Sequence, residues 1–175
     1  INKPYRGWKI SFFEGGIRVP YIVSWPDEIN PGKKSDSAVH HFDIFPTIAK
    51  AAGIESIHTL DGVDLLPFIK NEKQTKPHKT LFWRSGNHQS VLHEKWKYII
   101  SKKENFRWLF DTSVDPLESN NLIESHPEVA RKIEELMTKF NSEQNDPLFP
   151  ASYEVPIMID KYDGQKFEEG DEYLY

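Results

Sequence analysis

Residues 80–110 narrow the choice of fold more than any other stretch, because they contain four short runs rich in aromatic and β-branched residues. The runs cover residues 80–83, 90–93, 97–101 and 106–110. Gly86-Asn87 follows the first run and Glu94-Lys95 follows the second. Short β-prone segments divided in this way are typical of antiparallel strands that follow one another in a sheet. The sequence therefore predicts a small antiparallel four-stranded sheet.

A helix over residues 126–142 is predicted after this sheet. Ser125-His-Pro-Glu128 has the spacing of a capping box, in which the first and fourth side chains bond the backbone at a helix start. Apolar side chains then recur on one helical face: Val129, Ile133, Leu136, Met137 and Phe140. We expect this face to cover one side of the sheet.

The first part of the chain predicts a strand that follows a glycine turn. Apolar residues at 17, 19, 21 and 23 alternate with their neighbours after Gly15-Gly16, which is the period of a β-strand. Pro20 favours an edge position or an irregular start, since proline cannot donate to a central ladder.

Two helical segments capped by aspartate are predicted next. Asp43 precedes Pro46, which is tolerated in a first helical turn, and Gly53 is a suitable terminator. A shorter Asp-capped turn is expected at Asp64-Leu-Leu-Pro67. The polar stretch 71–79 is the most plausible boundary between two structural layers.

Composition excludes several classes of partner and site. The 175 residues are 38% hydrophobic, which suffices for a packed core, and the net charge is −5 without a basic run. Neither nucleic acid nor a membrane is expected as a partner.

The chain has no cysteine, so it offers no disulfide, thiolate metal site or cysteine nucleophile. It begins at Ile1 without an apolar leader, which suggests a processed, truncated or cloned fragment.

Lys9 is the first candidate for a chemical role. It lies a fixed distance before Glu14-Gly15-Gly16-x-Arg18. A lysine ammonium is a compact charge suited to a tetrahedral anion, and glycines let the backbone approach closely. A merely solvated loop lysine is the alternative. Glu14 and Arg18 are better suited to an internal ion pair that holds the loop than to direct catalysis.

Several motifs in collinear order, from about Tyr5 to Leu122, resemble the type I sulfatases of the alkaline-phosphatase-like superfamily. That family carries a lysine, four residues and then Glu-Gly-Gly-x-Arg, as Lys9 to Arg18 do here. Further segments that resemble it are Asp43-Ile-Phe-Pro-Thr with Ala52-Gly53, Leu60-Asp-Gly-x-Asp-Leu-x-Pro67, Trp96-Lys-Tyr98 and Leu109-Phe-Asp-x-x-x-Asp-Pro-x-Glu-x-x-Asn-Leu122. The later motifs are better explained by helix caps, core packing and a turn than by catalysis.

The resemblance implies an α/β fold, present as an α+β fragment. Residues 1–75 would be the last strand and helix elements of the large sulfatase α/β domain. Residues 76–145 would be the small antiparallel four-stranded subdomain packed on helix 126–142. Residues 146–175 are expected to form an irregular tail that is acidic and aromatic.

The resemblance also implies a site. Lys9 would bind the sulfate group, while Glu14, Gly15, Gly16 and Arg18 would shape the loop beside it. Arg84 and His88 lie where the family often brings residues towards the substrate, although an exposed loop role is slightly favoured for both.

The family needs a formylglycine nucleophile and calcium or magnesium, and the chain supplies neither. The formylglycine forms within Cys/Ser-x-Pro/Ala-x-Arg, which does not occur here, and no metal ligand set is predicted in this chain. The adjacent pair His40-His41 lacks a third ligand at a recognised spacing. We therefore expect a C-terminal sulfatase fragment, inactive alone, whose partners are the missing N-terminal domain and a sulfated small molecule or carbohydrate.

Two other functions stay open from the sequence. A phosphate or phosphonate ester hydrolase of the same superfamily would differ in its upstream nucleophile. A non-enzymatic binding or assembly domain would fold without an N-terminal partner, and an exposed apolar patch would count against it. Family analogy alone suggests a periplasmic or secreted location.

Overall fold

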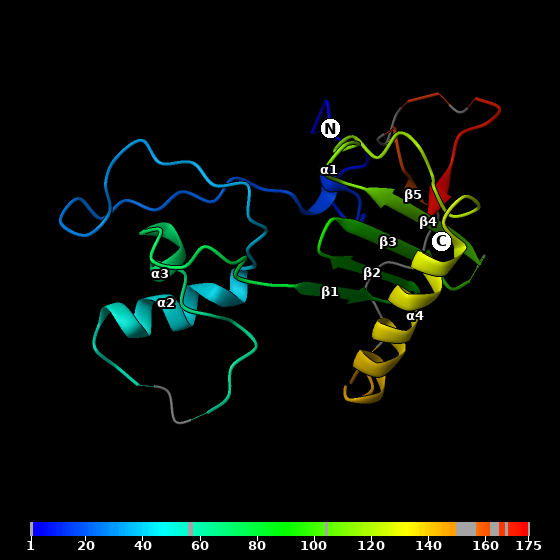
Figure 1. The fold of residues 1–175 in the computed structure, drawn as a ribbon. Coiled ribbons are helices and arrows are strands. Elements are labelled where there is room, and N and C mark those ends of the chain that lie inside the picture. Colours follow the sequence, from blue (N-terminus) through cyan, green and yellow to red (C-terminus); the bar gives the residue numbers. More distant parts are fainter. Residues whose placement is uncertain are drawn as a thin grey trace. The chain divides into compact units, whose positions relative to one another are not determined.

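The computed structural model describes residues 2–55, 58–103, 105–149, 157–161, 165–166 and 168–174. These residues form two compact units (Figure 1). The sheet unit consists of Ile1–Pro20 and Thr80–Tyr175, and the helical unit consists of Tyr21–Lys79. From sequence, residues 1–75 were placed in one domain, whereas residues 2–20 here belong to the sheet unit. That residues 1–75 end a larger α/β domain stays a prediction.

The predicted four-stranded sheet is confirmed. Its strands are β1 (Thr80–Ser85), β2 (His88–His93), β3 (Trp96–Ser101) and β4 (Phe106–Asp111). They are antiparallel and lie in the order β1-β2-β3-β4, so each strand pairs with its neighbours in sequence (Figure 1). The two-residue connections at 86–87 and 94–95 permit this meander.

The helix α4 (Pro127–Ser142) covers one face of the sheet, as predicted. Its buried side chains pack with apolar residues of three strands in one cluster: Val91, Tyr98, Leu109, Ala130, Ile133 and Met137. The predicted capping box is wrong, because His126 is the N-cap residue and caps with no side-chain bond. The Ser125 hydroxyl instead donates to the Leu122 carbonyl at 3.2 Å. Pro127 at the start of the helix lacks an N–H that would need a cap.

Alternate side chains of each strand point to the face of the sheet opposite α4. This second face also carries buried apolar residues. Its cluster contains residues from the N-terminal segment, the sheet and the tail: Phe13, Ile99, Trp108, Phe110, Ile157 and Ile159. The tail was expected to be irregular, but β5 (Ile157–Met158) and β6 (Tyr173–Leu174) pair antiparallel. The tail is ordered here because Ile157 and Ile159 are buried against this second face of the sheet. Burying apolar surface stabilises such a contact. Pro150 and Pro156 of the tail lie outside the described residues.

The helical unit contains the 3₁₀ helix η1 (His41–Asp43), α2 (Ile44–Ala51) and α3 (Leu66–Ile69). The predicted end of α2 is confirmed: Gly53 has φ +71°, its N–H bonds the Lys50 carbonyl, and Ile54 N–H bonds the Ala49 carbonyl. Asp43 is the N-cap residue of α2, as predicted, but its side chain makes no cap bond to α2 and takes part instead in a capping box at the start of η1. Helical geometry already begins in η1, so the carboxylate instead accepts the N–H groups of His40 at 2.7 Å and Val63 at 2.9 Å.

The strand predicted over residues 17–24 is absent. Gly15 and Gly16 lie within the single helical turn α1 (Glu14–Ile17), and the described residues from 18 to 25 form no strand. A strand needs a neighbour for its backbone groups, and β1 to β4 pair only among themselves within the described chain. The apolar side chains Val19 and Ile22 are consequently exposed, by 71% and 88%.

Asp111, at the end of β4, provides a pH-dependent contribution to the stability of the sheet unit. Its carboxylate accepts from Lys95 Nζ at 2.6 Å and from the Ser113 N–H at 3.1 Å. Burial alone would raise the pKa of Asp111, but these bonds outweigh burial and hold the pKa below its usual value. Asp111→Asn should cost about 1 kcal/mol near neutral pH. This contribution exists above the ordinary aspartate pKa and is lost as the pH falls through the lower folded value. Hydrogen exchange of β4 amides at pH 7 and pH 3 checks it, since the gap between the two proteins should be smaller at pH 3 than at pH 7.

Candidate functional site

The Lys9 loop, residues 7–13, is a tight turn in the sheet unit. Ser11 N–H donates to the Trp8 carbonyl at 3.0 Å, and the Ser11 hydroxyl donates to the same oxygen at 2.8 Å. Ile10 has φ +90°, a conformation that a β-branched residue rarely adopts. Lys9 lies at this turn with its side chain exposed. The turn thus presents an ammonium group to solvent from a defined backbone.

Gly15 and Gly16 permit the close packing that closes this loop. A Cβ on Gly15 would overlap the carbonyl oxygens of Gly7 and Arg6, and a Cβ on Gly16 would overlap the Ser11 carbonyl oxygen. Gly15 N–H donates to the Arg6 carbonyl at 2.7 Å. The predicted close backbone approach therefore occurs, but against the chain's own loop.

A buried ion network follows the loop directly. Lys97 Nζ on β3 lies 2.7 Å from Glu14 Oε1 and 2.9 Å from Glu118 Oε1. The side chains of Lys97 and Glu118 are fully buried, and Glu118 Oε2 also accepts the Glu14 N–H at 2.6 Å. Arg18 Nη1 lies 3.4 Å from Glu14 Oε2, so the expected Glu14–Arg18 pair exists as the outer part of this network.

Burial of Glu118 dominates its electrostatics. Burial raises the pKa of this carboxyl, and the nearby Lys97 ammonium and the Glu14 N–H lower it in part, which leaves the pKa above its ordinary value. An ammonium between two carboxylates lowers the cost of burying all three groups. Through these contacts the network joins Glu14, next to the Lys9 loop, to β3 and to the segment after β4.

Lys97 and Glu118 were not identified as site residues from sequence. The segment around Trp96 was interpreted as core packing, and Asp115-Pro116-x-Glu118 as a turn. The turn is real, because the Asp115 carboxylate accepts the N–H of Ser119 at 3.1 Å. The signal that was missed is Lys97 itself. It points to the same buried face of the sheet as Ile99, two residues on, and a buried ammonium requires an anion beside it.

The other two predicted contacts, Arg84 and His88, lie at the β1–β2 end of the sheet. Arg84 is exposed, and its Nη2 donates to the Asn145 carbonyl at 3.0 Å. His88 is not in an exposed loop: it is the first residue of β2 and is buried. Substrate contact by either residue stays a prediction.

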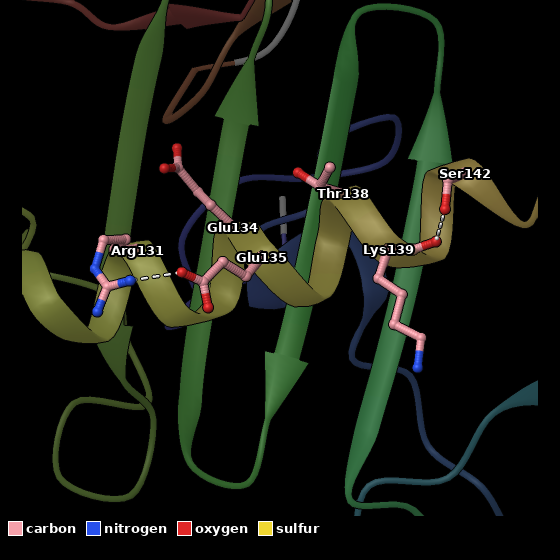
Figure 2. Close-up of a pocket in the computed structure, with 6 residues that line it drawn as sticks. All are labelled: Arg131, Glu134, Glu135, Thr138, Lys139 and Ser142. Atoms are coloured by element: carbon pink, nitrogen blue, oxygen red, sulfur yellow. Dashed lines mark hydrogen bonds and ion pairs between the residues drawn. The ribbon is translucent and has the colours of Figure 1, made fainter.

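Figure 2 shows a shallow hollow along the exposed side of α4. Arg131 and Glu135 pair within it, with Arg131 Nη1 2.6 Å from Glu135 Oε1, while Glu134 pairs with Arg107 outside the hollow. The lining residues are Arg131, Glu134, Glu135, Thr138, Lys139 and Ser142. None of them belongs to the predicted site.

A second hollow lies beside residues 3–8 and is also bordered by Glu118, Asp160 and Glu172. Arg6 dominates it, but this guanidinium pairs with both Asp160, at 3.3 Å, and Glu172. The Arg6 charge is therefore neutralised by the tail, and Arg6 holds the tail to the N-terminal segment.

The described residues offer no ligand set for calcium or magnesium. Among those that the structure describes, no three His, Asp or Glu side chains gather closely enough to hold a metal ion. His40 instead stacks on the Phe42 ring at 3.9 Å. In the same described part of the chain, no helix is long and apolar enough to cross a bilayer.

Comparison with known proteins gives the family. Residues 7–146 match the family described as N-sulphoglucosamine sulphohydrolase, C-terminal. The steryl-sulfatase of Rattus norvegicus is 35% identical over 127 residues, which are 71% of this chain and 22% of that protein. The N-acetylgalactosamine-6-O-sulfatase of Bacteroides thetaiotaomicron is 28% identical over 149 residues, or 76% of this chain and 29% of that protein.

Solved structures agree with this match. A Bacteroides thetaiotaomicron sulfatase from a locus for the metabolism of glycosaminoglycans has a TM-score of 0.68 and 28% identity, over 79% of this chain and 32% of that one. Ps i-CgsB in complex with k-i-k-neocarrahexaose has a TM-score of 0.74 and 26% identity, over 87% and 35%. The chain thus spans about a fifth to a third of the length of these proteins.

The match includes the Lys9 loop, the sheet, the buried network and α4, and it extends well beyond half of the 175 residues. The chain belongs to the family of sulfatase C-terminal domains described as N-sulphoglucosamine sulphohydrolase, C-terminal.

Proposed function

We propose that this chain is the C-terminal part of an enzyme that hydrolyses sulfate esters, and that Lys9 binds the sulfate group. The observation that carries the proposal is the exposed Lys9 ammonium on a turn whose backbone is fixed by Gly15, Gly16 and Ser11. Its sulfatase relatives support the reaction class.

Lys9 would act through charge. Cleavage of a sulfate ester changes the charge on the sulfate and leaving-group oxygens, and a fixed cation stabilises that change best when its position does not need to reorganise. Glu14, Gly15, Gly16 and Arg18 would keep the loop in place without touching the substrate. Arg84 and His88 are proposed as further substrate contacts. Arg84 would then give up its hydrogen bond to the Asn145 carbonyl and donate to the substrate instead.

The nucleophile and the metal ligands would come from parts of the parent protein outside this chain. The sequence has no cysteine and no Ser-x-Pro/Ala-x-Arg, so it offers no site for formylglycine. Calcium or magnesium would supply an electrophile for the sulfate oxygens. The chain alone is therefore expected to be inactive, with a sulfated small molecule or carbohydrate as the substrate of the whole enzyme.

An N-terminal domain of the same parent is the proposed partner of the helical unit. On α2, Phe45 and Ile48 are each 62% exposed and Ile44 is 41% exposed, so this helix presents an apolar face to solvent. Exposed apolar surface of this kind marks a face that another structure covers. This exposure counts against a stand-alone binding domain.

Lys9→Ala tests the proposal in the intact natural protein that carries this chain. Loss of the cation should lower kcat/KM for 4-nitrophenyl sulfate by about a hundredfold, the effect of removing one preorganised charge stabiliser. Lys34→Ala is the matched control, because Lys34 is an exposed loop lysine of the helical unit. Equal activity of the two variants, or hydrolysis of 4-nitrophenyl phosphate in preference to the sulfate, would contradict the proposal.

A further inference from the structure

We propose that Lys97 and Glu118 are positioning residues for Lys9: the buried network that they form with Glu14 holds the Lys9 loop against the sheet. This inference deepens the proposed function and rests on it. Neither residue would touch the substrate. Their effect would pass through the backbone of residues 7–16.

Glu14 is attached at two points, through its side chain and through its backbone. Its carboxylate binds Lys97 Nζ at 2.7 Å, while its backbone N–H donates to Glu118 Oε2 at 2.6 Å. Both partners come from distant parts of the sequence, β3 and the segment after β4. Glu14 is consequently fixed in position and in direction.

Backbone hydrogen bonds link Glu14 to the Lys9 loop. Gly15 N–H bonds the Arg6 carbonyl at 2.7 Å, and Gly16 N–H bonds the Phe13 carbonyl at 2.8 Å, so the turn that follows Glu14 closes the Lys9 loop. Phe13 is fully buried against Trp108, with ring centroids 5.5 Å apart. The loop therefore ends at two adjacent anchors, one apolar and one ionic.

The ionic anchor supplies a constraint that the apolar anchor does not. Apolar contact keeps the Phe13 side chain buried but has no preferred direction. Hydrogen bonds have preferred angles, so the bonds to Glu14 also fix the orientation of its backbone. A buried ion pair is weak evidence for a gain in stability over apolar packing. We therefore assign the network the role of fixing the orientation of the backbone between Lys9 and Glu14.

A double-mutant cycle between Lys9→Ala and Glu118→Gln tests this in the intact protein. Glu118→Gln should lower kcat/KM for 4-nitrophenyl sulfate about tenfold in the presence of Lys9, and less than about twofold in the Lys9→Ala background. Glu135→Gln is the matched control, because Glu135 is an exposed carboxylate paired with Arg131, and it should change neither background. Equal losses from Glu118→Gln in both backgrounds would overturn the inference while leaving the role of Lys9 intact.

Hydrogen exchange separates this inference from the proposed function. Glu118→Gln should speed exchange at the Ser11, Gly15 and Gly16 amides about tenfold and leave the β2–β3 amides unchanged. Glu118→Asp, which keeps the charge but shortens the side chain, should act in the same direction if the glutamine variant does not fold. Unchanged exchange in the loop would refute positioning. Faster exchange together with an active Lys9→Ala variant would support positioning and refute sulfate binding by Lys9.

Discussion

Replacing Lys97 by methionine is expected to destabilise the sheet unit by about 3 to 5 kcal/mol, the usual cost of leaving buried charges without their partner. Methionine has a similar length but no charge, so Glu14 and Glu118 would remain buried beside each other without the ammonium between them. Glu118 would become protonated or the network would open to water. Hydrogen exchange of the slowest β3 amides in the intact protein measures the loss.

Two further variants make this prediction specific. Lys95→Met removes a lysine two residues away that is half exposed and paired with Asp111, and it should cost no more than about 1 kcal/mol. Adding Glu14→Gln and Glu118→Gln to Lys97→Met removes all three charges and should recover much of the stability. A Lys97→Met variant as stable as Lys95→Met would show that the carboxylates do not need the buried cation.

The sheet was predictable from sequence because its signals are local. Each strand is a short β-prone run, and Gly86-Asn87 and Glu94-Lys95 leave room only for tight turns. The apolar face of α4 was predictable for the same reason, since its period is set within one segment. The two-sided burial of the sheet was not, because the cover over Trp108 comes from Ile157 and Ile159, far along the chain.

The errors have a shared physical origin in partners that local patterns do not reveal. Residues 17–24 have the alternation of a strand but find no neighbouring strand among the described residues. Asp43 has the sequence context of a helix cap, yet His78 Nε2 lies 2.8 Å from its carboxylate and backbone N–H groups from two segments bind it. A cap can be inferred from four residues, whereas such a hub depends on tertiary contacts.

The candidate site divides in the same way. The Lys9 motif and the need for Gly15 and Gly16 followed from a short stretch, and the structure explains the glycines by close backbone contact. Lys97 and Glu118 are 83 and 104 residues from Glu14, so no local spacing could join the three. The strand register places Lys97 opposite Phe110, and tertiary contacts of the N-terminal segment and of the segment after β4 bring Glu14 and Glu118 to it.

Gly16→Ala is expected to disrupt the Lys9 loop, with a loss of about 3 kcal/mol or more in the local stability of residues 7–16. The added methyl group would overlap the Ser11 carbonyl oxygen, and a backbone atom cannot turn away as a side chain can. The loop must then open, which would also displace Lys9. Exchange rates of the Ser11 and Gly15 amides measure the opening, and kcat/KM for 4-nitrophenyl sulfate in the intact protein should fall at least as far as in Lys9→Ala.

Gly53→Ala separates this steric effect from the ordinary cost of replacing glycine. Gly53 has φ +71°, where alanine is strained by about 1 to 2 kcal/mol, but a Cβ there would meet open space. Its effect should be confined to the end of α2 and leave the Lys9 loop unchanged. If Gly16→Ala disturbs the loop no more than Gly53→Ala does, close packing at Gly16 is not what shapes the loop, and the rigidity attributed to the Lys9 turn must come from its other anchors, the buried Phe13 side chain and the Glu14–Lys97–Glu118 network.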